Sequence, residues 1–156
     1  MKLFIGKTYI ILIVGVIAML FILSYSSEKG SRPDNPMQLL QEPCPGTPNC
    51  ISTMYPEDSD HFLPPLPFKE NLEKSKEFII KIIENNSGAE IVENNDTMIY
   101  AQFTIPIFRF IDDTVFLFGK ERKIIHFHSS SRIGTWDLGV NRRRMKKTSQ
   151  HYLNSM

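Results

Sequence analysis

Residues 97–129 read TMIYAQFTIPIFRFIDDTVFLFGKERKIIHFHS and hold three of the segments that decide the fold. In residues 97–105 every second side chain is apolar, which is the period of a half-buried strand. Residues 113–118 and 123–129 are rich in branched and aromatic side chains, which favour strands. A shorter candidate strand, residues 89–93, precedes them.

Turn-forming residues separate these segments. Residues 94–96 and 119–122 have the composition of hairpin loops, and Pro106 is expected to end the second strand or place it at an edge. Short connections imply antiparallel neighbours. The pattern therefore predicts an antiparallel meander of about four strands.

Two helices are expected to flank the sheet. Residues 71–85 carry Leu72, Ile79, Ile82 and Ile83 on one face, with charged residues on the other. Residues 141–153 form the closing helix, with an inward stripe of Met145, Ser149 and Tyr152. Both helices have an apolar side to bury, so the fold class is α+β with two helices packed on one face of the sheet.

The N-terminus predicts a membrane segment. Lys2 and Lys7 precede an uncharged run over residues 8–27, whose centre at residues 9–23 is almost wholly apolar. That length lies between a secretory signal and a full membrane span, and the lysines favour a cytoplasmic N-terminus. We expect residues 1–27 to be an uncleaved signal anchor, with a cleaved signal peptide and a secreted protein as the alternative.

The remaining chain divides into a tether and one domain. Residues 28–43 are polar and rich in Pro and Gly, which predicts a flexible tether, and residues 44–156 suffice for a single globular domain. The formal net charge is +1, and aromatic and basic residues are not interleaved as in nucleic-acid-binding proteins. Nucleic acid is therefore not an expected partner.

The chain has two cysteines, Cys44 and Cys50, in the sequence CPGTPNC. In a segment outside the cytoplasm they predict a local disulfide. A redox pair and half of a metal site are the alternatives, although the spacing is not that of a Cys-x-x-Cys motif.

Three motifs carry a resemblance to a known family. They are Cys-Pro-x-Thr-Pro-Asn-Cys at residues 44–50, Arg-Phe-Ile-Asp-Asp at residues 109–113, and Ile-His-x-x-Ser-x-Ser-Arg-x-Gly-x-x-Asp-Leu-Gly-x-Asn-x-x-Arg at residues 125–144. Together they resemble the DUF1499 family, a bacterial and plastid group to which no reaction is assigned. His128 departs from the family pattern, in which this position is more often Arg. The resemblance implies a bacterial source, and the N-terminal segment then leads us to expect a single-pass inner-membrane protein whose domain lies in the periplasm or outside the cell.

The candidate site lies where the last strand joins the closing helix. Its arginines and aspartates are expected to form ion pairs, some of them bidentate, and its glycines permit tight turns. This network either fixes the fold or leaves guanidinium groups that receive an anionic ligand, a lipid headgroup or an envelope protein. The candidate ligand-binding residues are Arg109, Asp112, Asp113, Ser129, Arg132, Asp137, Asn141, Arg142 and Arg144.

An enzyme is the second class of function. His126 and His128 project from one face of a strand, and with His61, Asp112 or Asp113 they would make a metal site. Ser129 beside a histidine would make a hydrolase, although no nucleophile elbow surrounds it. A structural subunit of a membrane complex is the third class. We assign no catalytic residue, metal or cofactor, and expect an accessory or binding domain.

Overall fold

A six-stranded antiparallel sheet forms the centre of the computed structural model, which describes residues 2–105 and 109–155 and, within the first helix, the side chains of residues 9–22 and 25. The strand order is β1-β6-β5-β4-β3, and β2 pairs with β6 beside β1. The strands are β1 (Cys50–Ser52), β2 (Leu66–Pro67), β3 (Ala89–Asn94), β4 (Met98–Thr104), β5 (Ile111–Gly119) and β6 (Ile124–Ser131).

The antiparallel meander of the last four strands confirms the prediction, and two features differ from it. The short strands β1 and β2 were missed, because two or three residues are too few to show alternation and Pro67 is tolerated only at a sheet edge. Strand β5 begins at Ile111, two residues before the predicted start. Asp112 therefore lies within the sheet rather than in the preceding loop.

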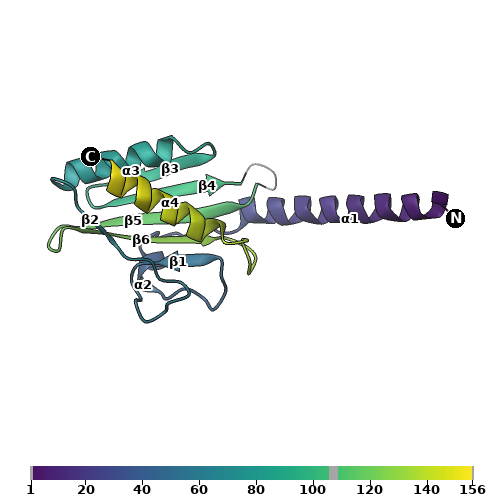
Figure 1. Cartoon of the computed structure of the whole chain (residues 1–156), viewed down its shortest axis with the longest axis horizontal. Coiled ribbons are helices and arrows are strands. Elements are labelled where there is room, and N and C mark those ends of the chain that lie inside the picture. The colour runs from purple at the N-terminus through teal and green to yellow at the C-terminus, as the bar shows by residue number, and fades with distance from the viewer. Residues whose placement is uncertain (1, 106–108, 156) are drawn as a thin grey trace.

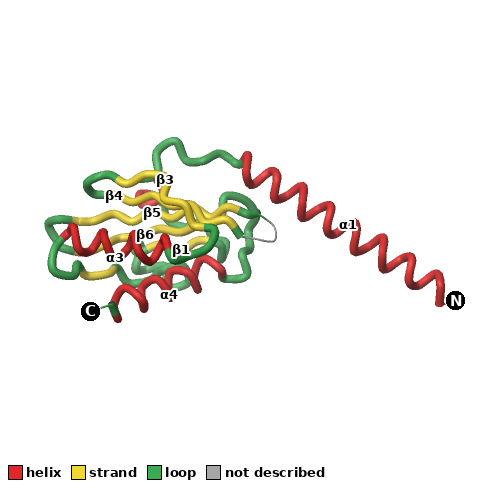
Figure 2. Tube along the Cα trace, turned by 90° about the horizontal axis from the view of Figure 1, so that it is seen from above, coloured by secondary structure: helices red, strands yellow, loops and turns green. Residues whose placement is uncertain are grey.

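Helices α3 (Leu72–Glu84) and α4 (Val140–Asn154) cover one face of the sheet, as predicted (Figures 1 and 2). Asn71 caps α3, since its side chain accepts a hydrogen bond from the Lys74 backbone N–H. Ile79 and Ile83 from α3 and Met145 and Tyr152 from α4 pack against the apolar side chains of the sheet.

The inward stripe of α4 differs by one position from the prediction. The buried residues are Asn141, Met145, Thr148 and Tyr152, at alternating spacings of four and three. Ser149 is only half-buried, so its assignment to the stripe was wrong. The extra inward residue, Asn141, is polar and has consequences for the site below.

The turn from α3 into β3 lies directly against the end of β4. Gly88 has a φ of 93°, and a Cβ at this position would lie 2.6 Å from the Thr104 carbonyl oxygen. Its own carbonyl accepts the Thr104 backbone N–H at 2.8 Å. Glycine is therefore required by both the backbone conformation and the close approach.

The opposite face of the sheet is covered by the segment that precedes the domain. Helix α2 (Gln38–Gln41) places Leu40 against Met98, Tyr100 and Val115. Residues 28–43 were expected to be a flexible tether, but the second half of this segment packs on the sheet because Leu40 and its neighbours supply apolar surface.

Helix α1 (Lys2–Lys29) projects from one end of the domain (Figures 1 and 2). Its large apolar side chains in the described part are exposed, from Tyr9 at 64% to Ile22 at 67%, except Leu20, which is half-buried. Within the described residues, no helix has both the length and the apolar content needed to cross a membrane. The core clusters contain none of the α1 residues whose side chains are described.

Candidate functional site

Asp112 and Asp113 point to opposite faces of the sheet, because successive residues of a strand alternate. Asp112 is fully buried and faces the helices, and Asp113 is 4% exposed and faces the other side. Each carboxylate has its own arginine: Arg144 pairs with Asp112, and Arg132 pairs with Asp113. The predicted site is thus two networks, one on each face.

On the helix face, Asp112 joins β5 to α4. Its carboxylate accepts hydrogen bonds from Arg144 Nη2 and Ser131 Oγ, both at 2.5 Å. The Arg144 guanidinium also lies over the Phe103 ring, 4.5 Å from its centroid. Both partners are almost inaccessible to water, so the pair is a structural contact between the sheet and the helix.

Asn141 connects three segments within the same network. Its amide nitrogen lies 3.2 Å from the Asn49 carbonyl oxygen and 3.0 Å from Ser131 Oγ. Its amide oxygen accepts from Ser129 Oγ at 2.6 Å and from Arg144 at 2.9 Å. The side chain is fully buried, so this single amide ties the Cys44–Cys50 loop, β6 and α4 together.

The Asp137 side chain caps the N-terminal end of α4. Its carboxylate accepts the backbone N–H groups of Gly139 and Asn141 at 2.8 and 2.7 Å, as expected from the sequence. Gly139, the residue before the helix, has a φ of 73°. Cations in the first half of α4 interact unfavourably with the helix dipole, and the negative charge of Asp137 partly offsets this repulsion.

The second network lies on the face opposite the helices. Arg132 donates Nε and Nη2 to the two oxygens of Asp113, both at 2.8 Å, which confirms the expected bidentate geometry. Tyr100 donates its hydroxyl to Asp113 at 2.5 Å. Burial raises the pKa of Tyr100, and the neighbouring carboxylate adds to the effect. Burial opposes the charge on Arg132, but Asp113 and Tyr100 together outweigh it and raise the pKa of that guanidinium.

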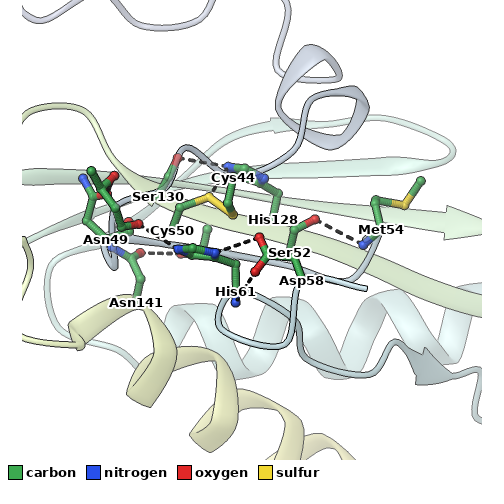
Figure 3. Close-up of a disulfide and its surroundings, with 12 residues drawn as sticks. Cys44, Asn49, Cys50, Ser52, Met54, Asp58, His61, His128, Ser130 and Asn141 are labelled. Carbon is green, nitrogen blue, oxygen red and sulfur yellow. Dashed lines mark hydrogen bonds and ion pairs between the residues drawn. A yellow bond between two sulfur atoms is a disulfide. The ribbon is translucent and has the colours of Figure 1, made fainter. Parts of the chain in front are cut away.

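The Cys44–Cys50 disulfide is present, as predicted, and lies beside His128 (Figure 3). His128 Nε2 is 3.5 Å from Cys50 Sγ and 3.1 Å from Ser130 Oγ. Its Nδ1 is buried without a hydrogen-bond partner among the described atoms. Burial lowers the pKa of His128 to about 4, against a smaller opposing effect of Asp113, so the ring is neutral at pH 7.

Reducing the disulfide is expected to lower the free energy of unfolding by about 2 kcal/mol, because the cross-link restricts the unfolded chain. Urea unfolding with and without a thiol reductant measures this difference. In the variant carrying both Cys44→Ala and Cys50→Ala, the reductant should have no effect. Thiols that react in unfolded protein without prior reduction would contradict the assignment.

The residues that would form an enzyme site, His61, His126 and Ser129, each contact different partners and not one another. His126 Nδ1 lies 3.0 Å from Thr53 Oγ1, whereas His61 lies between Asp58 and the Thr47 carbonyl oxygen. Ser129 Oγ contacts Thr114 and Asn141 rather than a histidine.

Among the described residues, Cys44, Cys50 and His128 are grouped closely enough to hold a metal, with ligand atoms within 4.8 Å. In this group the two sulfur atoms are bonded to each other. Among the described residues, no carboxylate is hydrogen-bonded to the His128 ring in the way that orients a catalytic imidazole.

A basic groove of about 440 Å³ lies between α3 and α4, next to the end of β4. Arg143, Lys147 and His151 line it and are exposed, and Ile82 and Phe103 supply apolar wall. Their spacing of four residues along α4 places the basic side chains on one helix face. That spacing is visible in the sequence, yet these residues were not among the predicted ligand-binding residues.

The predicted candidates therefore fall into two groups. Seven belong to the two networks or to the cap of α4, namely Asp112, Asp113, Ser129, Arg132, Asp137, Asn141 and Arg144. Arg142 lies outside them and donates to the Asp60 carbonyl oxygen. Arg109 is exposed in the β4–β5 connection, with a φ of 53°; residues 106–108 of that connection lie outside the described residues.

Comparison with known sequences agrees with the motifs. A model of the family described as "Protein of unknown function (DUF1499)" matches residues 41–151. The chain belongs to the DUF1499 family. Neither a curated protein nor a solved structure matches it significantly. The DUF1499 region contains the disulfide, all six strands and both networks, and α1 lies outside it.

The DUF1499 motifs converge on one part of the fold. Asn49 of the cysteine motif contacts Asn141 of the third motif, and Asp112 of the second motif contacts Arg144 of the third. Three segments distant in sequence are thus joined by buried polar contacts. In this DUF1499 protein the motifs mark the structural connection between the sheet and α4.

Proposed function

We propose that this chain is a membrane-tethered, envelope-facing accessory domain that binds an anionic ligand in the basic groove between α3 and α4. The groove supports this proposal because Arg143, Lys147 and His151 are exposed there, whereas Arg132 and Arg144 are held by buried carboxylates. The proposed ligand therefore contacts the exposed basic residues of α4, and not Arg132 and Arg144 of the two networks. A phosphate-bearing lipid headgroup is the ligand class that fits a domain held at a membrane.

The tether is proposed from α1. Its sequence combines an apolar centre with lysines at the N-terminal side, and its described apolar side chains are not covered by the domain. These features favour a single-pass protein of the bacterial inner membrane, with the domain in the periplasm or outside the cell. Figure 1 shows that α1 leaves the domain at the end where α4 begins. The groove would then face the lipid surface.

Sedimentation with vesicles tests the binding function. We expect residues 30–156, which contain every described residue of the two core clusters, to sediment with vesicles of anionic phospholipid at low salt and to remain in solution with zwitterionic vesicles. Each basic side chain near the surface contributes about 1 kcal/mol, so Arg143→Gln with Lys147→Gln should weaken partitioning by roughly thirtyfold.

The matched control removes two cations at the other end of the domain. Lys120 and Arg122 are exposed in the β5–β6 turn, and their replacement with Gln changes the net charge by the same amount. This control should sediment nearly as the unmodified domain does. Equal losses in both variants would show a nonspecific charge effect, and indifference to lipid charge would contradict the proposed ligand class.

A further inference from the structure

The connection between β6 and α4 exposes two large apolar side chains. Trp136 is 70% exposed and Leu138 is 62% exposed. Among the described residues outside α1, these are the two most exposed large apolar side chains; Leu153 and Met54 follow at 48% and 37%. An exposed apolar pair in one short segment indicates a contact surface rather than chance exposure.

This segment is held in place from both sides. The Asn49 side chain donates to the Gly134 carbonyl oxygen at 2.7 Å, and Arg143 donates to the Leu138 carbonyl oxygen at 2.6 Å. Leu138 has a φ of 57°, a conformation that residues other than Gly, Asn and Asp rarely adopt. The fold therefore presents Leu138 to solvent by fixing the backbone around it.

Charge near the pair is positive. Asp137 lies between the two apolar residues, but its carboxylate is occupied by the backbone N–H groups of Gly139 and Asn141. Immediately beyond, α4 carries Arg142, Arg143, Lys146 and Lys147 in its first half. Apolar tips beside a basic helix face are complementary to anionic headgroups over an acyl boundary.

The position of the segment agrees with the same partner. The β6–α4 connection and the start of α4 lie at the end of the domain from which α1 projects, whereas the β5–β6 turn lies at the opposite end (Figures 1 and 2). A lipid surface that holds α1 would therefore face the end of the domain that carries the β6–α4 connection, with Trp136 and Leu138.

We propose that Trp136 and Leu138 insert into the interface of an anionic lipid surface and orient the domain on it. This proposal rests on the membrane tethering proposed above and adds a second contact, at which the indole lies at headgroup level and Leu138 reaches the acyl boundary. Two side chains give weak, reversible binding by themselves, so the contact sets orientation while α1 supplies attachment. The basic groove is thereby turned toward the headgroups.

Trp136 is the only tryptophan of the chain, so its fluorescence reports the contact directly. The full chain is reconstituted into anionic phospholipid vesicles with and without bromine-labelled acyl chains, which quench tryptophan at short range. We expect a blue-shifted emission and several-fold quenching by the labelled lipid. Leu138→Ser should reduce the blue shift and the quenching while leaving sedimentation with the vesicles unchanged.

A second position distinguishes insertion from general proximity. In a Trp136→Phe background, Lys120→Trp places the reporter at the opposite end of the domain, where quenching should be absent. Sedimentation of the full chain without quenching of Trp136 would overturn the insertion and leave the tethered function standing. Failure of the full chain to sediment with vesicles would overturn both, and equal quenching at the two positions would overturn the specific orientation.

Discussion

Replacing Asp112 with alanine is expected to lower the free energy of unfolding by about 3–5 kcal/mol, the range for breaking one partner of a buried ion pair. The carboxylate is fully buried, and its removal leaves the Arg144 guanidinium, 10% exposed, without its counter-charge. Urea unfolding monitored by circular dichroism of residues 30–156 measures the change.

The double-mutant cycle separates the ion pair from general disruption of the core. Arg144→Met removes the charge but keeps much of the stem that lies over Phe103. The variant carrying both substitutions should be destabilised by less than the sum of the two single variants, because neither charge is then left unpaired. As a surface control, Glu77→Gln disrupts exposed pairs with Lys74 and Lys81 and should change stability little. Strict additivity in the Asp112 cycle would contradict the proposed coupling.

His128 should make the domain less stable as the pH falls below neutrality. Its pKa is about 4 in the folded protein and about 6.5 in an unfolded chain, so the unfolded state binds more protons between these values. The contribution of His128 to the free energy of unfolding is therefore fully present above pH 6.5. It is lost as the pH falls to about 4, which lowers the free energy of unfolding by about 3 kcal/mol. Burial also lowers the pKa of His126, which acts in the same direction.

Substitution identifies the histidine that is responsible. His128→Gln should flatten the pH dependence of the free energy of unfolding between pH 7 and pH 4.5, measured by urea titration. His151→Gln, which replaces an exposed histidine on α4, provides the matched control and should retain the unmodified slope. The same slope in all three proteins would show that protonation of His128 does not limit acid stability.

Local patterns in the sequence were enough to predict the meander and the two covering helices. Each hairpin joins segments that are neighbours in the sequence. The alternation of apolar residues in 97–105 indicates a strand with one buried face. The pairing of β1 and β2 with β6 joins residues about 60 to 80 positions apart, which no local pattern encodes. The pairing across that distance depends on packing and on the disulfide loop.

The candidate site was predictable as a set of residues but not as an arrangement. Arg132, Asp113 and Asn141 could be named from their chemistry, whereas their separation onto two faces required the correct start of β5. Had Ile111 been included in that strand, alternation would have placed Asp112 and Asp113 on opposite sides. The groove residues Arg143, Lys147 and His151 were not predicted as one site, because the run of basic residues at 142–147 extends around more than one face of α4 and hides their four-residue spacing.

The adjacent aspartates also specify how β5 aligns with its neighbours. A slip of one residue would turn Asp112 toward Arg132 and Asp113 toward the helices, exchanging every side chain between the faces. Asp113 and Val115 would then move to the face covered by α4, although Val115 packs with Leu40 of α2 in the native register. Phe116 and Phe118 would leave the core under the helices. Misaligned pairings are thus penalised by the loss of the present hydrogen bonds of Asp112 with Ser131 and of Asp113 with Tyr100 and Arg132, and by the loss of apolar burial. The native contacts of the two aspartates therefore favour one register of β5 over its one-residue neighbours.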